Sequence, residues 1–178
     1  MNIRPSLWLD AARDAAAHQQ HPPGALYVVA TPIGNLADLT LRALYVLSAA
    51  DLVACEDTRV TGGLLLRLDL RRPLLALHAH NEHEAATQVL DALAQGRTVV
   101  LVSDAGTPAV SDPGARVVAR ARAAGYRVVP VPGVSSVMAA LSVAGDDVAG
   151  HDGSPGGFRF VGFLPAKGAE RAQALQAL

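Results

Sequence analysis

Short, uninterrupted apolar runs alternate along this chain with segments of helical spacing, and this alternation constrains the fold more than any other feature. The runs predict strands at residues 24–30, 51–55, 74–77, 98–102 and 127–131. None of them alternates apolar with polar residues, as a strand with one face in water does. Continuous apolar strands separated by helices are typical of a parallel sheet buried on both faces. The sequence therefore predicts an α/β fold with a parallel five-stranded sheet flanked by helices.

The segments between these runs have apolar residues at the spacing of helices. Asn81, with Glu84 three residues later, predicts a capping box at the start of one helix, and Gly96 predicts its end. The other helices are expected at residues 39–50, 61–68, 115–124 and 135–144.

Three regions are expected along the chain. Residues 1–23 predict a flexible N-terminal leader, and residues 24–133 predict the α/β domain. Residues 134–178 predict a helix, a polar linker at 145–157, a strand at 158–163 and a helix at 169–178. Because this last strand has no sheet of its own in the sequence, we expect it to begin a second, truncated α/β domain.

Composition excludes several classes of protein. Hydrophobic residues make up 51% and charged residues 17% of the chain, which excludes a disordered protein. A formal net charge of −1 gives no bulk attraction to nucleic acid or membranes. The single cysteine, Cys55, excludes an internal disulfide. Residues 128–145 are uncharged, but their Pro130, Pro132 and Gly133 favour a strand, a turn and a helix over a membrane span. We expect a cytoplasmic protein.

Polar and turn residues follow every expected strand at its carboxyl end. They lie at residues 31–35 (TPIGN), 56–59 (EDTR), 78–82 (HAHNE), 103–114 (SDAGTPAVSDPG) and 132–136 (PGVSS). The turns at the opposite edge, such as residues 95–97, are plainer. Open parallel sheets bind ligands beyond the carboxyl ends of their strands. The sequence therefore predicts one site at this edge.

The segment at residues 103–114 is the densest of these loops. Its Asp104 stands where a carboxylate can hold a ribose hydroxyl or an ammonium group, and Gly106 would let the backbone approach a ligand closely. The alternative is an ordinary loop in which Asp112 forms an Asx turn.

The first loop excludes two common nucleotide sites. It has one glycine where a dinucleotide fingerprint needs three, and the only lysine of the chain, Lys167, lies far from any phosphate-binding loop. Hydride transfer and kinase chemistry therefore lose their main support.

Glu56, Asp57 and Arg59 follow a single strand. The two adjacent carboxylates could act as a base and its orienting partner, and Arg59 could hold a phosphate. The alternative is a capped helix start with a local ion pair.

The remaining polar groups have ordinary alternatives. His78, His80 and His83 lack cysteine partners and a fixed ligand spacing, so no metal site is expected. Ser135 and Ser136 suit a polar ligand at a helix N-terminus, or serve only as caps. Two arginine clusters predict solvated faces, with nucleic-acid contact as the alternative, at residues 67, 71, 72 and at 116, 120, 122.

Taken in order, these motifs resemble the tetrapyrrole methylase superfamily of S-adenosyl-L-methionine-dependent methyltransferases. The matching segments are residues 26–44, 54–59, 78–82, 101–114, 129–136 and 162–168. The EDTR and HNE runs resemble, more narrowly, the members that methylate the ribose 2′-hydroxyl of a cytidine in 16S rRNA of the small ribosomal subunit. The resemblance implies a tetrapyrrole methylase-like fold, a cofactor held between two α/β domains, and a homodimer.

The resemblance also implies which residues contact the cofactor. By motif position they are Pro32, Gly34, Ser103, Asp104, Ala105, Gly106, Val110, Ser135 and Ser136. A ribose hydroxyl is a poor nucleophile, so its attack on the sulfonium methyl needs positioning and a proton acceptor. Chemistry alone offers Glu56, Asp57 and His78 as catalytic bases, with Arg59 orienting a phosphate.

Two other functions stay open. A methylase of a tetrapyrrole, corrin-type small molecule would share the looser form of the motifs. An inactive cofactor-binding fragment is the other alternative, because the proteins that this chain resembles continue beyond the position of residue 178 through a complete second domain. The segment at residues 151–157 also departs from them, since it is longer and richer in glycine than the short crossover that they have before the motif at residues 162–168.

Overall fold

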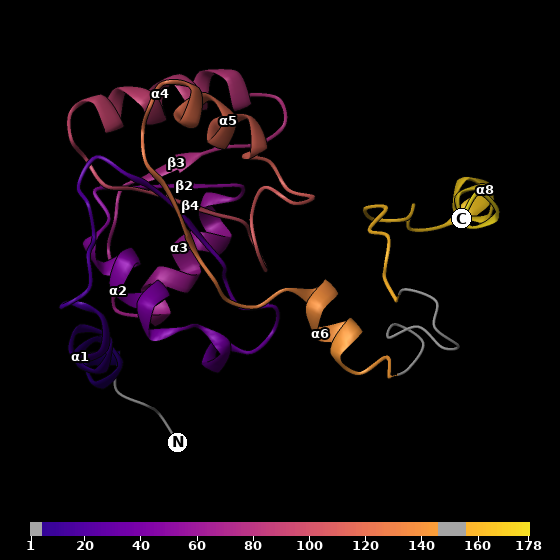
Figure 1. The fold of residues 1–178 in the computed structure, drawn as a ribbon, viewed down its shortest axis with the longest axis horizontal. Helices are drawn as coiled ribbons and strands as arrows, with labels where there is room; N and C mark the ends of the chain where they lie inside the picture. The colour runs from indigo at the N-terminus through magenta and orange to yellow at the C-terminus, as the bar shows by residue number, and fades with distance from the viewer. Residues whose placement is uncertain (1–4, 146–155) are drawn as a thin grey trace. The chain divides into compact units, whose positions relative to one another are not determined.

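The structure is a computed structural model that describes residues 5–145 and 156–178 (Figure 1). It divides into two compact units, residues 1–136 and residues 137–178. The first unit contains a sheet of five parallel strands in the order β3-β2-β4-β1-β5. Its strands are β1 (Leu26–Val29), β2 (Leu52–Cys55), β3 (Leu74–Ala76), β4 (Val99–Val102) and β5 (Val128–Val131). Each lies within its expected run, which confirms the predicted sheet.

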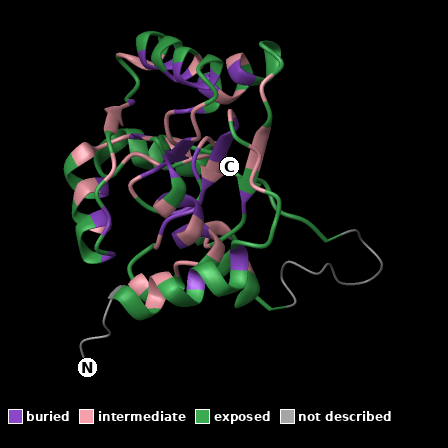
Figure 2. Ribbon diagram, turned by 90° about the vertical axis from the view of Figure 1, so that its left-hand side faces the viewer, coloured by how far each residue is buried: buried purple, intermediate pink, exposed green. Residues whose placement is uncertain are grey.

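The central strand β4 explains why the apolar runs are continuous. All four of its residues are buried, because both faces of the sheet are covered. Val100 is paired in register with Tyr27 of β1 on one side and with Val53 of β2 on the other. Buried residues are concentrated on the strands and on the helix faces turned toward them (Figure 2).

Helices cover both faces of the sheet, and two separate apolar clusters lie between them and the strands (Figure 1). One cluster includes residues of α1 (Pro5–Ala16), α2 (Leu41–Ala49) and α3 (Thr58–Arg67), and the other includes residues of α4 (Glu82–Ala94) and α5 (Ala115–Ala123).

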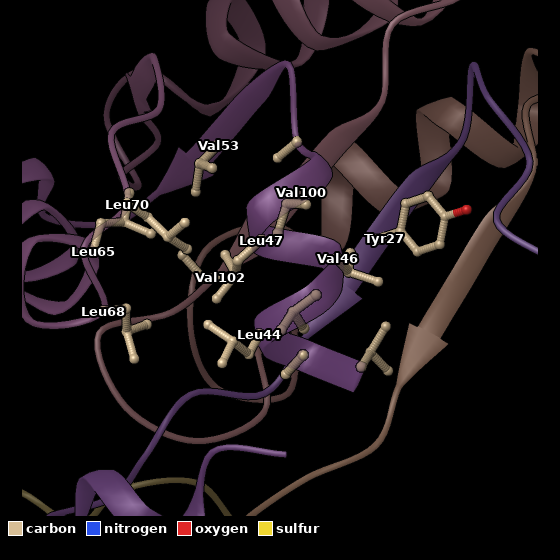
Figure 3. Close-up of a cluster of buried hydrophobic side chains, with 14 of the residues drawn as sticks. Tyr27, Leu44, Val46, Leu47, Val53, Leu65, Leu68, Leu70, Val100 and Val102 are labelled. Atoms are coloured by element: carbon tan, nitrogen blue, oxygen red, sulfur yellow. The ribbon is translucent and has the colours of Figure 1, made fainter. Parts of the chain in front are cut away.

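The cluster under α2 is drawn in Figure 3. Leu44 and Leu47 of α2 pack there with Leu65 of α3 and with Val100 and Val102 of β4. Burying each of these side chains contributes about 1.5–3 kcal/mol to folding.

Residues 5–16 differ from the flexible leader predicted for residues 1–23, because they form α1 and pack against α2. Ala12 and Ala16 are 0% and 1% exposed, and Trp8 packs against the same core. The residues that make the contact are spaced four apart on one helix face. Two of the three are alanines, which carry little hydrophobic signal in a sequence.

Two helix starts also differ from the prediction. α3 begins at Thr58, three residues early, because the Asp57 carboxylate accepts the backbone N–H of Arg59 at 2.8 Å. The predicted capping box at Asn81 is wrong: this side chain makes no cap hydrogen bond. Its amide instead accepts the backbone N–H of His78 at 2.8 Å and donates to the carbonyl of Ala76 at 2.9 Å, so it ties the turn back to β3.

A short helical turn precedes α2. The 3₁₀ helix η1 (Leu36–Asp38) is followed by Thr40, whose hydroxyl accepts the N–H of Ala43 at 3.1 Å and caps α2. The predicted start at residue 39 therefore falls between two helices.

The second unit is described by itself. Most of α6 (Ser136–Ser142) and all of α8 (Gly168–Gln176) lie in it, in agreement with the two predicted helices. The strand predicted at residues 158–163 is wrong, since the described residues 156–165 contain none. A strand needs a neighbouring strand for its backbone groups, and Phe158 and Phe163 remain 55% and 80% exposed. Most of the predicted linker, residues 146–155, lies outside the described residues.

Across residues 5–145 and 156–178, no helix has the length and apolarity required to cross a membrane.

The packing of α1 predicts a specific sensitivity to charge. Ala12→Asp would bury a carboxylate against α2, so we expect it to lower the free energy of unfolding by about 2 kcal/mol or more. Ala15→Asp places the same group on the exposed face of α1 and is the control. Urea denaturation measures both, and equal stabilities would contradict the docking of α1.

Candidate functional site

The loop at residues 103–114, which follows the central strand β4, is hydrogen-bonded to the segments that follow all four other strands. It therefore lies at the centre of the carboxyl edge, where the sequence predicts the site. These bonds fix the loops relative to one another.

The tightest connection joins this loop to the one after β1. The backbone N–H groups of Thr31 and Gly106 each donate to the other residue's carbonyl at 2.9 Å. Thr31 is only 1% exposed, and its hydroxyl donates to the carbonyl of Ser103 at 3.0 Å. The Ser103 hydroxyl in turn donates to the carbonyls of Ala105 and Gly106 at 3.4 and 3.3 Å. Gly106 has φ of 86°, a conformation that glycine adopts without strain.

Three further contacts complete the edge. The Asp104 carboxylate accepts the backbone N–H of Asp57, after β2, at 3.0 Å. The Thr107 hydroxyl donates to the carbonyl of Val134, after β5, at 3.1 Å. Glu82, at the start of α4, accepts the backbone N–H groups of Gly114 and Arg116 at 3.0 and 3.2 Å.

A close approach of backbones supports the same edge. A Cβ atom added to Gly133 would lie 2.9 Å from the Cβ of Ala30, nearer than real Cβ contacts allow. Glycine is therefore required where the chain after β5 passes the end of β1.

A cavity of about 380 Å³ opens at this edge, between the first loop, Asp104 and α3. Its wall from α3 consists of two adjacent rows of residues, each with a spacing of four, which lie along one side of the helix. The lining residues are Thr31, Pro32, Gly34, Leu36, Arg59, Val60, Gly63, Leu64, Arg67 and Asp104.

An ion pair stands at the start of α3. The Arg59 guanidinium donates to both carboxylate oxygens of Asp57, from Nη2 at 2.5 Å and from Nε at 3.0 and 3.2 Å. Arg59 therefore lowers the pKa of Asp57 from 3.8 to about 2, and Asp57 raises the pKa of Arg59. Asp57 stays a carboxylate at neutral pH and is a weak proton acceptor.

Glu56 directly precedes Asp57, but its pKa is shifted in the opposite direction. Burial raises the pKa of its carboxyl group, and the negative charges of Asp104, Asp112 and Asp57 raise it further. Of the two adjacent acids, Glu56 is therefore the more basic.

The structure brings four of the predicted site residues to the cavity: Pro32, Gly34, Arg59 and Asp104. Ser103 and Gly106 are buried and hold the loops together, whereas Ala105 and Val110 are exposed and do not line this cavity. Ser135 and Ser136, at the start of α6, also lie outside its lining.

The histidines after β3 do not line the cavity either. His78 is exposed, with its ring centre 6.1 Å from that of His80. Across residues 5–145 and 156–178, no group of three His, Cys, Asp or Glu side chains could hold a metal ion.

Sequence reasoning missed the α3 wall. Gly63, Leu64 and Arg67 were expected only as parts of the helix predicted at residues 61–68 and, for Arg67, of an arginine cluster, and Val60 was not singled out. The signal that could have found Gly63 and Arg67 is their spacing of four and eight residues from Arg59, which follows a strand end, and Val60 and Leu64 repeat this spacing one residue further on.

The profile of the Tetrapyrrole (Corrin/Porphyrin) Methylases matches residues 25–176, which is most of the chain. The chain belongs to this family.

Several curated sequence relatives of this chain share one name. Proteins named "Ribosomal RNA small subunit methyltransferase I" are 55% identical over 148 residues in Neisseria meningitidis serogroup A and 51% identical over 156 residues in Escherichia coli O157:H7. The alignments cover 83% and 87% of this chain but 48% and 52% of those proteins. This methylase chain thus spans about half the length of the curated relatives it matches.

Solved structures of tetrapyrrole methylases share its fold. A cobalt precorrin-4 methyltransferase is 27% identical with a TM-score of 0.56, covering 71% of this chain and 54% of its own. A uroporphyrin-III-C-methyltransferase from Thermus thermophilus is 28% identical with a TM-score of 0.53, covering 68% and 52%.

The Asp57–Arg59 pair predicts a pH dependence of stability. A lowered pKa means that the folded chain favours the carboxylate, so the pair stabilises the methylase above pH 3.8 and this contribution is lost as the pH falls toward about 2. Asp57→Asn keeps a good helix cap but removes the charge. We expect its stability deficit to be largest at neutral pH and to disappear in acid.

Urea denaturation across this pH range measures the deficit. The control is Asp91→Asn, which removes an exposed carboxylate of α4 that makes no ion pair with any described residue. A deficit that is constant with pH would show that the pair does not stabilise the fold.

Proposed function

We propose that this methylase transfers a methyl group from S-adenosyl-L-methionine to the ribose 2′-hydroxyl of a cytidine in 16S rRNA, within the small ribosomal subunit. The observation that carries the proposal is the cavity at the carboxyl edge, lined by motif residues of the family and by Asp104. The name of the relatives at 47–55% identity supports the substrate. The proposal includes the cytoplasmic location and the homodimer that the resemblance implies.

The residues of the cavity fit the cofactor. Its volume of about 380 Å³ falls within the range of small-molecule sites, about 300–1,000 Å³. The second oxygen of Asp104 can accept from ribose hydroxyls or an ammonium group while Oδ1 holds the backbone of Asp57. Leu36 and Leu64 offer apolar contact to an adenine ring, and apart from its chain neighbours and the backbone of its own helix no atom lies within 4 Å of where a Gly63 Cβ would stand. When bound, the cofactor supplies an electrophilic methyl group on a positively charged sulfur.

The acidic residues at this edge suit a cationic ligand. Asp57, Asp104 and Asp112 each interact electrostatically with Glu56, and of these four acids only Asp57 forms an ion pair with an arginine of the described residues. A sulfonium and an ammonium group beside them would be stabilised by the excess negative charge.

Glu56 is the residue we assign as proton acceptor. The ribose hydroxyl must lose its proton as its oxygen attacks, and a carboxylate with a raised pKa takes a proton more readily than an ordinary one. Asp57 is less basic because of Arg59, and its role is to cap α3 and hold Arg59. Neither Glu56 nor His78 lines the cavity, but Glu56 interacts electrostatically with Asp104, which does, and this interaction favours Glu56 over His78.

A small tetrapyrrole acceptor is the second candidate. It is favoured by the solved structures that share the fold, whose names specify uroporphyrin and precorrin methylation. These are 27–28% identical to this chain, against 47–55% for the rRNA methyltransferases, and the rRNA substrate is therefore preferred.

Methyl transfer to isolated small ribosomal subunits tests the proposal. We expect label from S-adenosyl-L-methionine to enter 16S rRNA at a cytidine ribose, as located by nuclease digestion and mass spectrometry. Asp104→Asn should weaken cofactor binding about tenfold in calorimetry, since a charged hydrogen-bond acceptor is lost, while Asp91→Asn should not. Transfer only to a tetrapyrrole acceptor would favour the second candidate, and cofactor binding without transfer to either acceptor would indicate a binding fragment.

The assignment of Glu56 predicts the pH profile of the reaction. The base must be ionised, so kcat should rise as the pH passes through its raised pKa. Glu56→Gln should lower kcat by about 10²-fold and remove this rise. Asp57→Asn is the matched control and should retain it. An unchanged profile in Glu56→Gln would exclude Glu56 as the base.

A further inference from the structure

Two arginines of α3 line the cavity, one in the first turn and one in the last. Arg59 and Arg67 are eight residues apart, which is about 12 Å along a helix. Gly63 lies between them, and the space beside it is open, because apart from its chain neighbours and the backbone of its own helix no atom lies within 4 Å of where its Cβ would stand.

The charges of these two arginines are compensated differently. Arg59 donates three hydrogen bonds to Asp57, so its charge is largely neutralised by its own helix cap. Arg67 is exposed, and its guanidinium makes no hydrogen bond or ion pair with any residue in the described ranges. Among the lining residues, Arg67 is therefore the cation available for an external anion.

We propose that Arg67 binds a phosphodiester of the RNA strand at the rim of the cavity, and that Arg59 serves mainly to hold Asp57. This inference rests on the proposed function. The guanidinium fork matches two phosphate oxygens, and this geometry gives a bidentate contact. The net charge of −1 provides no general attraction to RNA, so binding depends on local cations such as this one.

The carboxylate of the cofactor offers the same chemistry as a phosphate. A bound small molecule is usually buried over most of its surface, whereas Arg67 is exposed and so lies at the rim of the cavity. A rim cation is better placed for a polymer that continues outside the cavity, which favours the phosphodiester.

Binding of a short single-stranded oligoribonucleotide across a series of salt concentrations tests the proposal. Arg67→Ala should weaken binding about tenfold and should reduce the slope of log K against log salt by about 0.7, the value for one contact to a single strand. Arg122→Ala, which removes an exposed arginine of α5, is the matched control for net charge. Arg67→Lys should restore part of the affinity, because the charge returns without the fork.

Calorimetry separates the two anions. S-adenosyl-L-methionine should bind Arg67→Ala and the parent chain equally. Weaker binding of this cofactor, with unchanged binding of 5′-methylthioadenosine, which lacks the carboxylate, would overturn the proposal in favour of the cofactor.

Equal losses of RNA affinity in Arg67→Ala and Arg122→Ala would also overturn it, as would a parent chain that binds no RNA. Failure of the proposed function looks different, since a missing methyl transfer to ribosomal subunits would leave the salt-dependent effect of Arg67→Ala in place.

Discussion

Two backbone hydrogen bonds between Thr31 and Gly106 hold together the loops that follow the neighbouring strands β1 and β4. They extend the pairing of two parallel strands into an antiparallel bridge just beyond the sheet. The side chains below it leave no hydroxyl unpaired, since Thr31 donates to Ser103 and Ser103 donates to Ala105 and Gly106. Buried polar groups are costly unless they are paired, so these bonds specify one arrangement of the two loops. The positions of Asp104 and of the loop after β1, both of which line the cavity, depend on them.

The same arrangement sets the electrostatics of the edge. Parallel strands bring several carboxylates to one end of the sheet, where the negative charges of three of them raise the pKa of Glu56. Arg59 forms its ion pair with Asp57, whereas Glu56 is left with burial and three negative neighbours. Two adjacent residues of one motif thereby acquire opposite proton affinities, and this difference separates a candidate base from an orienting group.

The five strands could be predicted because a doubly covered parallel strand leaves a continuous apolar run, as in β4. The docking of α1 could not, since the contact at Ala12 and Ala16 depends on small side chains that also suit an exposed helix. The strand at residues 158–163 was predicted from local propensity, but strand formation requires a partner. The capping box failed for a related reason, because Asn81 finds better partners in His78 and Ala76 than in its own helix. The sequence thus predicts strands that are buried on both faces, and it predicts less well the elements whose structure depends on one particular tertiary contact.

In the candidate site, too, some parts could be predicted from the sequence and others could not. The loops were predicted because the carboxyl edge of an open sheet is a position defined by topology, whereas the α3 wall follows from where one helix begins. Asp57 fixes that start by accepting the N–H of Arg59. A start one residue later would rotate the helix face by about 100° and would turn Gly63 and Arg67 away from Asp104. The residue that caps α3 therefore also determines which side chains line the cavity, and the charge pattern of the wall cannot change independently of the helix cap.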